Sequence, residues 1–187
     1  MPIEAFASQN CSIARTLSVL GERWTMLVLR ELSLGNTRFD EVQRELGVAT
    51  NILSARLTTL VDEGIAERHR YSEHPERYEY RLTQKGWDLQ PILLGFLRWG
   101  DRYTAGRRGA PLETVHADCG HAFHMVPTCS HCGGEIKPST TRVRPGPGAT
   151  REQRERGRPR NAALPAQRWI SPRRRTWPPP RPGSRTR

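Results

Sequence analysis

Cysteine and histidine side chains gather in one short stretch of this 187-residue chain. Residues 116–134 have the sequence HADCGHAFHMVPTCSHCGG, which contains two similar motifs, H-x2-C-G and C-x2-C-G. Two ligands three residues apart on a tight turn can face one metal ion, and a glycine after the second ligand permits that turn. The spacing predicts one closed, tetrahedral, structural zinc site with the ligands His116, Cys119, Cys129 and Cys132.

Three other histidines lie in the same stretch and leave the fourth ligand open. His121 is the second choice if His116 does not bind, and His124 and His131 are also near. Free thiols or a disulfide are the alternative state of these cysteines. A hydrolytic zinc site would keep one position open and place a glutamate nearby, which these motifs do not do. Without a phosphate loop or a nucleophile elbow either, the sequence predicts no enzyme.

The remaining cysteine, Cys11, stands alone at the start of the first predicted helix. The partial positive charge at a helix N-terminus favours the thiolate, which is the reactive form of cysteine. A lone cysteine is just as often a small buried apolar residue. Cys11 is therefore a candidate redox-sensing residue, with a packing role as the alternative.

The overall composition indicates a cytoplasmic protein with one core. Apolar residues make up 35% of the chain, and no run approaches the length of a membrane span. The first ten residues lack the basic and then apolar pattern of a signal peptide. Four cysteines in a reducing compartment favour metal or redox chemistry over disulfides.

The positive charge of the chain lies almost entirely in its last fifty residues. Residues 138–187 hold 14 arginines and two glutamates, a net charge of +12, whereas residues 1–137 hold 16 basic and 17 acidic residues, a net charge of −1. The stretch 138–187 is rich in arginine, proline and glycine, so we predict that it is disordered. Its arginines suit nonspecific binding of nucleic acid, although GC-rich coding sequence produces the same composition.

Residues 10–82 have the pattern of helices followed by a hairpin. The first helix is expected after a cap at Asn10, the second over 22–34, the third over 40–46, and the fourth after a cap at Thr50. Gly47 makes the turn of a helix-turn-helix, and Gly64 ends the fourth helix. Two short runs, 65–71 and 77–82, flank a polar turn as in a hairpin. The predicted fold is mainly α with a small β-hairpin, a winged helix-turn-helix.

The fourth helix and the hairpin offer polar and basic side chains suited to DNA. In the major groove we expect Asn51 to pair with adenine and Arg56 with guanine or phosphate. An ion pair from Arg56 to Asp40, Glu41 or another acid of the helix-turn-helix is the alternative. The other predicted contacts are Thr50, Ser54 and Thr58 on the helix and Arg70, His74 and Arg77 on the wing.

A long amphipathic segment follows the hairpin from Thr83, with an apolar set that includes Trp87, Phe96 and Trp99. Pro91 should kink or divide this helix. The apolar surface exceeds what so small a core needs, so we expect it to pack on a second copy of the chain, together with the first helix. The alternative is that it covers the hairpin of its own chain.

Residues 11–103 resemble the HxlR family of winged-helix transcription regulators, which is related to the MarR type. The resemblance rests on three segments in order, which are CSIARTLSVLGERWTMLVLRELSLGNTRFDEVQRELGVATNILSARLTTLVDEGIAER, PERYEYRLTQKGWDLQPIL and the closing Trp99. Ser12 and Ala49 stand where proline and serine are common in the family. The resemblance implies a homodimer on a pseudo-palindromic operator, usually a repressor, built from the first and last helices. Some family members sense oxidants or electrophiles through a cysteine near the position of Cys11.

The sequence therefore predicts three regions. Residues 1–104 form a DNA-binding and dimerisation domain, 105–137 a small zinc-binding knuckle, and 138–187 a disordered tail. The predicted function is sequence-specific regulation of transcription in the cytoplasm, at the nucleoid, with redox or electrophile stress as a candidate signal. Nonspecific binding of nucleic acid through the basic tail is the alternative function.

Overall fold

The computed structural model describes residues 8–106 and 109–156. The chain divides into two compact units, residues 1–127 and 128–187, and each is described by itself. The boundary between them falls inside the stretch 105–137 that the sequence suggested as one segment. The first unit holds the predicted winged helix-turn-helix.

The first unit begins with helices α2 (Ser12–Leu20), α3 (Thr25–Ser33), α4 (Phe39–Leu46) and α5 (Thr50–Asp62). They follow the predicted order, although α3 begins three residues after the predicted start at residue 22. Gly47 ends α4 with φ of 60°, and Gly64 follows α5 with φ of 63°. Only glycine adopts this backbone conformation without strain, which is why both helices end where the sequence indicated.

Two predicted helix caps are wrong. The residue before α2 is Cys11 rather than Asn10, and the residue before α5 is Ala49 rather than Thr50. Neither makes a hydrogen bond from its side chain to the helix. Thr50 is instead the first residue of α5, and its hydroxyl accepts a hydrogen bond from Gln43 on α4.

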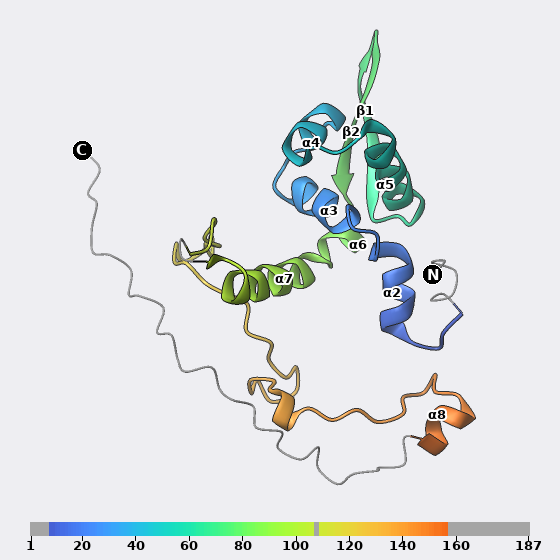
Figure 1. The fold of residues 1–187 in the computed structure, drawn as a ribbon, viewed down its shortest axis with the longest axis vertical. Coiled ribbons are helices and arrows are strands. Elements are labelled where there is room, and N and C mark those ends of the chain that lie inside the picture. Colours follow the sequence, from blue (N-terminus) through green and yellow to red (C-terminus); the bar gives the residue numbers. More distant parts are fainter. Residues whose placement is uncertain (1–7, 107–108, 157–187) are drawn as a thin grey trace, which may run out of the picture. The chain divides into compact units, whose positions relative to one another are not determined.

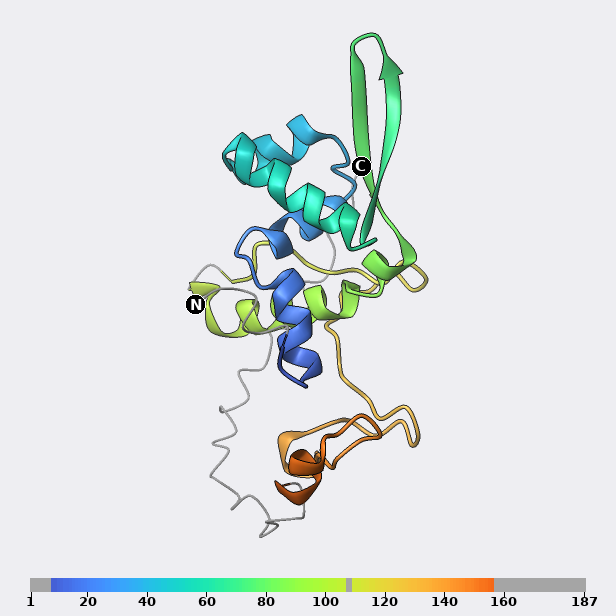
Figure 2. The ribbon, with the colours of Figure 1, turned by 90° about the vertical axis from the view of Figure 1, so that its right-hand side faces the viewer.

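Strands β1 (Ala66–Glu73) and β2 (Glu76–Leu82) form the predicted antiparallel hairpin. Figures 1 and 2 both show it extending beyond helices α4 and α5. The loop between α3 and α4 adds to β2, because Arg38 bridges to Glu79 and the Tyr80 amide donates to the Thr37 carbonyl at 2.7 Å. The hairpin is thus joined to the helix-turn-helix by backbone hydrogen bonds.

The core of the first unit lies among α3, α4, α5 and the start of β1. Its largest fully buried side chains are Leu29, Leu53, Leu57, Leu60, Val28 and Val42. Leu53, Leu57 and Leu60 come from one face of α5, as their spacing predicts. Truncation of one such leucine to alanine typically costs about 2–5 kcal/mol of stability. Burial of this face fixes which side of α5 remains in solvent.

Two helices follow the hairpin, α6 (Gln84–Trp87) and α7 (Gln90–Tyr103). Pro91 lies in the first turn of α7, so it divides the predicted segment in two rather than bending one helix. No residue of α7 is fully buried. Among the described residues, no helix is long and apolar enough to cross a membrane.

The second unit contains a 3-10 turn, η2 (Pro138–Thr140), and helix α8 (Arg151–Arg156). The helix corrects the prediction of disorder over 138–187 at this position. Thr150 accepts a hydrogen bond from the Gln153 amide at 3.1 Å, and Gln153 accepts one from the Thr150 amide at 2.9 Å, which is a capping box. The rest of the predicted disordered tail, residues 157–187, lies outside the described residues.

Candidate DNA-binding surface

The solvent-facing side of α5 carries most of the predicted base-contacting residues. Thr50, Asn51, Ser54 and Thr58 are all exposed, and they lie opposite the buried leucines. Ala55 adds a small exposed residue to the same region. A helix face made of small polar side chains can approach the base edges of the major groove without large groups in the way.

Arg56 differs from the other predicted contacts on α5. Its side chain is 22% exposed and forms an ion pair with Glu22, with Nη1 and Oε2 3.7 Å apart. The ion-pair alternative is therefore the arrangement seen, although the acid precedes α3 and is neither Asp40 nor Glu41. In this state Arg56 joins α5 to the start of α3 rather than extending toward a DNA groove.

Three of the four arginines of the wing have different surroundings, and the fourth, Arg81, forms an ion pair with Glu79. Arg68 stacks on Tyr78, with its guanidinium carbon 3.3 Å from the ring centroid. Arg70 pairs with Glu73 at 3.3 Å and with Glu76 at 3.7 Å. Arg77 is exposed and forms no ion pair within the described part of the chain. Exposed ion pairs are weak, so Arg70 can leave its glutamate partners to bind another anion. Arg77 has no such partner to leave among the described residues.

His74 is exposed at the tip of the hairpin, between β1 and β2. It precedes Pro75 through a cis peptide bond. Together with Arg70 and Arg77, it makes up the set of wing residues that the sequence predicted to contact DNA. All three lie in the turn of the hairpin or in the half next to it. The hairpin itself extends beyond α4 and α5 (Figures 1 and 2).

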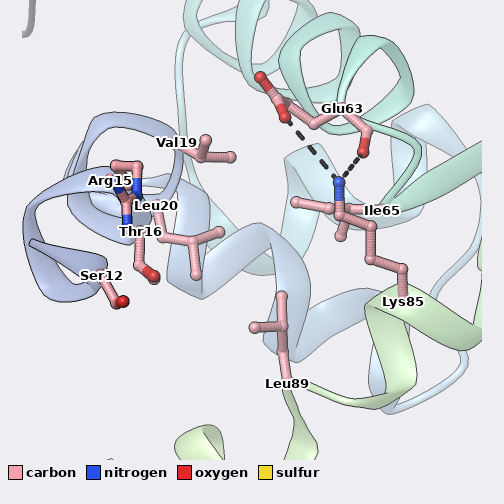
Figure 3. Close-up of a pocket in the computed structure, with 9 residues that line it drawn as sticks. All are labelled: Ser12, Arg15, Thr16, Val19, Leu20, Glu63, Ile65, Lys85 and Leu89. Atoms are coloured by element: carbon pink, nitrogen blue, oxygen red, sulfur yellow. Dashed lines mark hydrogen bonds and ion pairs between the residues drawn. The ribbon is translucent and has the colours of Figure 1, made fainter. Parts of the chain in front are cut away.

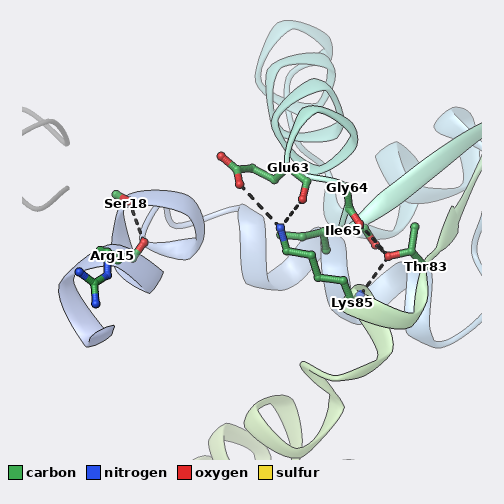
Figure 4. Close-up of polar contacts among 8 residues, drawn as sticks. Arg15, Ser18, Glu63, Gly64, Ile65, Thr83 and Lys85 are labelled. Carbon is green, nitrogen blue, oxygen red and sulfur yellow. Dashed lines mark hydrogen bonds and ion pairs between the residues drawn. The ribbon is translucent and has the colours of Figure 1, made fainter. Parts of the chain in front are cut away.

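Thr83 and Lys85 hold the base of the wing against the end of α5, as Figure 4 shows. The Thr83 hydroxyl donates to the carbonyls of Gly64 at 2.8 Å and Ile65 at 3.2 Å, and it accepts from the Gly86 amide at 3.2 Å. Lys85 donates to the Glu63 carbonyl and lies 3.9 Å from the Glu63 carboxylate. These positioning residues were absent from the predicted site, although Thr83 stood out as the start of the next helix.

A cavity of about 350 Å³ lies between α2 and the base of the wing, as Figure 3 shows. Its apolar lining is Val19, Leu20, Ile65 and Leu89, and its polar lining is Ser12, Arg15, Thr16, Glu63 and Lys85. Leu20 and Ile65 also belong to the core of the unit. The cavity thus marks where α2 meets the winged helix, near the Lys85 and Glu63 pair.

The predicted metal ligands come together in pairs. His116 and Cys119 lie in the first unit, with Nδ1 and Sγ 3.4 Å apart, and Cys129 and Cys132 lie in the second. Backbone hydrogen bonds from Cys132 and then His131, and one from the Cys132 side chain, lower the pKa of the Cys129 thiol from its ordinary value of 9.0. Within the described residues, no group of three or more histidine, cysteine or acidic side chains is assembled around one point. The four-ligand site remains a prediction.

Cys11 is exposed and directly precedes α2. Its amide donates to the Gln9 carbonyl at 2.7 Å, and its carbonyl accepts from the Arg15 amide at 3.0 Å. The thiol is thus open to solvent at the N-terminal end of the helix. Cys11 is therefore exposed in the single chain rather than packed in its core, and its redox role stays a prediction.

A helix-turn-helix whose second helix exposes a polar face beside a basic wing defines a winged-helix DNA-binding protein. The sequence profile of the HxlR-like helix-turn-helix family matches residues 19–108. An HTH-type transcriptional regulator of Mycobacterium tuberculosis is 42% identical over 137 residues, which cover 73% of this chain and 87% of the relative. The chain belongs to the HxlR family and is a helix-turn-helix regulator of transcription.

Two solved structures agree with this assignment. PA1607, described as a candidate transcription factor, is 35% identical with a TM-score of 0.67 and covers 74% of this chain and 97% of that one. PA1374 of Pseudomonas aeruginosa, also a candidate transcription factor, is 37% identical with a TM-score of 0.55 and covers 78% and 99%. The family profile ends at residue 108, whereas the alignment with the mycobacterial relative spans 137 residues and so must extend past that point. The likeness therefore continues beyond the winged helix.

Proposed function

We propose that this protein is a homodimeric repressor that binds a pseudo-palindromic operator through α5 and the wing. Thr50, Asn51, Ser54 and Thr58 face the major groove, and Asn51 pairs with adenine. Arg77, His74 and Arg70 contact phosphates or the adjacent minor groove. A dimer seated over a promoter represses because it occupies DNA that the polymerase needs.

The single observation that carries this proposal is the exposed polar face of α5. Its residues have no part in the core, because Leu53, Leu57 and Leu60 fill the buried face. Arg56 is left out of the base-reading set because Glu22 already pairs with it. In this proposal Arg77 on the wing contacts the DNA backbone while α5 occupies the groove.

An apolar stripe on α7 supports the homodimer. Ile92, Phe96, Trp99 and Tyr103 follow one another at helical spacing, and their exposed fractions are 41%, 64%, 61% and 52%. On α2, Ile13 and Leu17 are also exposed, at 72% and 45%. Large apolar side chains in this number favour burial against a second copy of the chain. Two copies related by a two-fold axis would present two α5 helices to two half-sites.

Cys11 supports a redox response as part of the same function. Its exposed thiol lies next to α2, one of the two helices proposed to form the dimer. Oxidation or alkylation there would change packing at the interface and thereby operator affinity. Diamide should lower or raise operator affinity of the wild type, and a Cys11→Ser protein that responds as strongly would remove this role.

The alternative function, nonspecific binding through the basic tail, makes a different prediction about salt and sequence. Fluorescence anisotropy of the full chain on DNA from upstream of its own gene, against a scrambled duplex, separates the two across a salt series. Regulation through α5 requires a preference for the upstream duplex that Asn51→Ala reduces. Equal affinity for both duplexes with a steep salt dependence would favour the tail as the binding element.

A further inference from the structure

Two stretches of the chain fold into the same turn, which we call the first knuckle (residues 115–122) and the second knuckle (128–135). In the first knuckle the His116 amide donates to the His121 carbonyl at 3.0 Å, and the Gly120 amide donates to the His116 carbonyl at 2.8 Å. A bridge between Val115 and Ala122 closes it.

The second knuckle repeats this pattern at the same relative positions. The Cys129 amide donates to the Gly134 carbonyl at 2.8 Å, and the Gly133 amide donates to the Cys129 carbonyl at 2.8 Å. A bridge between Thr128 and Glu135 closes it. The glycines agree as well, with φ of 69° at Gly120 and 70° at Gly133. Each knuckle therefore presents its two ligand positions on an equivalent backbone.

The equivalence of the two knuckles shows which histidine of the first occupies the position of a cysteine ligand in the second. His116 occupies the position of Cys129, and Cys119 occupies the position of Cys132. His121 follows the glycine of the first knuckle, where the second knuckle has Gly134. Gly134 has no side chain that could bind a metal, so His121 has no counterpart among the predicted ligands. The geometry therefore favours His116 over His121 as the metal ligand.

The distance within the first knuckle suits a shared metal ion. Zinc bonds of about 2.0 Å to nitrogen and 2.3 Å to sulfur at a tetrahedral angle separate these two atoms by about 3.5 Å. His116 Nδ1 and Cys119 Sγ are 3.4 Å apart. The Asp118 carboxylate lies 3.8 Å from Nε2 of the same ring, on the side where zinc-bound histidines commonly have a carboxylate partner.

The knuckles lack the apolar burial that usually stabilises such a turn. Every residue of the first knuckle is exposed, including Val115, and in the second knuckle only Cys129 is half-buried. Exposed cysteines on tight turns of this kind add nothing to a hydrophobic core. A metal ion supplies the missing stabilisation in small segments that cannot bury enough surface.

We propose that the chain binds one structural zinc ion through both knuckles, with His116, Cys119, Cys129 and Cys132 as its ligands. The three cysteines bind as thiolates and release their protons, and the histidine binds as neutral imidazole. Four protein ligands leave no position for substrate, so the ion has a structural role. This site is separate from the proposed DNA contacts, and its test does not depend on them.

The first test uses the full-length wild-type chain. Purified with zinc in the medium, it should contain one zinc ion per chain by elemental analysis. Cobalt(II) added to the metal-free chain should give the intense absorption of tetrahedral cobalt with thiolate charge-transfer bands. A chain that retains no zinc, or a cobalt spectrum of an octahedral ion without thiolate bands, would overturn the proposal.

Variants then assign the ligands. His116→Ala, Cys119→Ser and Cys132→Ser should each weaken zinc binding at least about 10-fold in competition with a chelator. His121→Ala, His124→Ala and Cys11→Ser are the matched controls and should bind zinc like the wild type. The loss of zinc from His121→Ala with retention by His116→Ala would contradict the ligand set. Circular dichroism of each variant with DNA-binding measurements separates loss of metal from loss of the winged-helix fold.

Discussion

Gln43 on α4 donates a hydrogen bond from Nε2 to the Thr50 hydroxyl of α5 at 2.8 Å, across the turn of the helix-turn-helix. The same amide lies 3.4 Å from the Val48 carbonyl within that turn. Thr50 therefore contributes to the DNA-binding surface in two ways, because its hydroxyl fixes the start of α5 while its side chain stays exposed. The Thr50 hydroxyl thus orients α5 rather than capping it.

Substitution of Gln43 by alanine should loosen the turn. The loss of one partly exposed hydrogen bond predicts a decrease in the free energy of unfolding of about 0.5–1.5 kcal/mol, measured by urea denaturation. Thr50→Val should lower stability by a similar amount and Thr50→Ser by less, since serine keeps the acceptor. Thr58→Ala, on the same face without such a contact, is the control and should change stability by less than about 0.5 kcal/mol.

Local patterns in the sequence were sufficient to predict the helix-turn-helix and its wing. The leucine spacing of α5 and the glycines after α4 and α5 act within a few residues, so their consequences are local. The bridge from Arg38 to Glu79 joins residues far apart in sequence, and no local pattern indicates it. The sequence offered an ion pair of Arg56 as an alternative, but it did not indicate Glu22 as the partner, for the same reason. The capping box before α8 lies in a stretch whose composition favours disorder, so the sequence analysis did not predict this helix.

Asn51→Ala should reduce sequence preference more than general affinity. A bidentate pair with adenine contributes about 1–3 kcal/mol of discrimination, so the affinity for the upstream duplex should fall about 5- to 150-fold while that for the scrambled duplex changes little. Anisotropy titrations on both duplexes at one salt concentration measure the ratio. Equal losses on the two duplexes would show that Asn51 does not recognise a base.

Arg77→Ala should weaken binding to every sequence alike. Arg77 has no ion pair among the described residues, so a phosphate contact would be its main interaction, and its loss should reduce the slope of log affinity against log salt by about 1. Arg68→Ala is the matched control on the same hairpin, because Arg68 already stacks on Tyr78. A change in slope as large for Arg68→Ala as for Arg77→Ala would contradict this division of roles.

Arg56→Ala should change stability without changing sequence preference. The Arg56 and Glu22 side chains are 22% and 46% exposed, so solvent screens their attraction, and a double-mutant cycle should give a coupling energy of about 0.5 kcal/mol or less. The ratio of affinities for upstream and scrambled DNA should stay within about twofold of the wild type. A large fall in that ratio would return Arg56 to the base-reading set.

Phe96→Asp should convert the proposed homodimer into a monomer, because Phe96 lies in the middle of the exposed apolar stripe of α7. A carboxylate in an apolar interface loses its hydration without gaining a partner, and the cost of several kcal/mol exceeds what most small dimers can absorb. Light scattering coupled to size-exclusion chromatography gives the mass, with Gln90→Ala at the exposed start of α7 as the control. The monomer should lose operator affinity steeply, since one α5 helix then engages one half-site at a time. A variant that remains dimeric would place the interface elsewhere, whereas a wild type that is already monomeric would rule out the proposed homodimer.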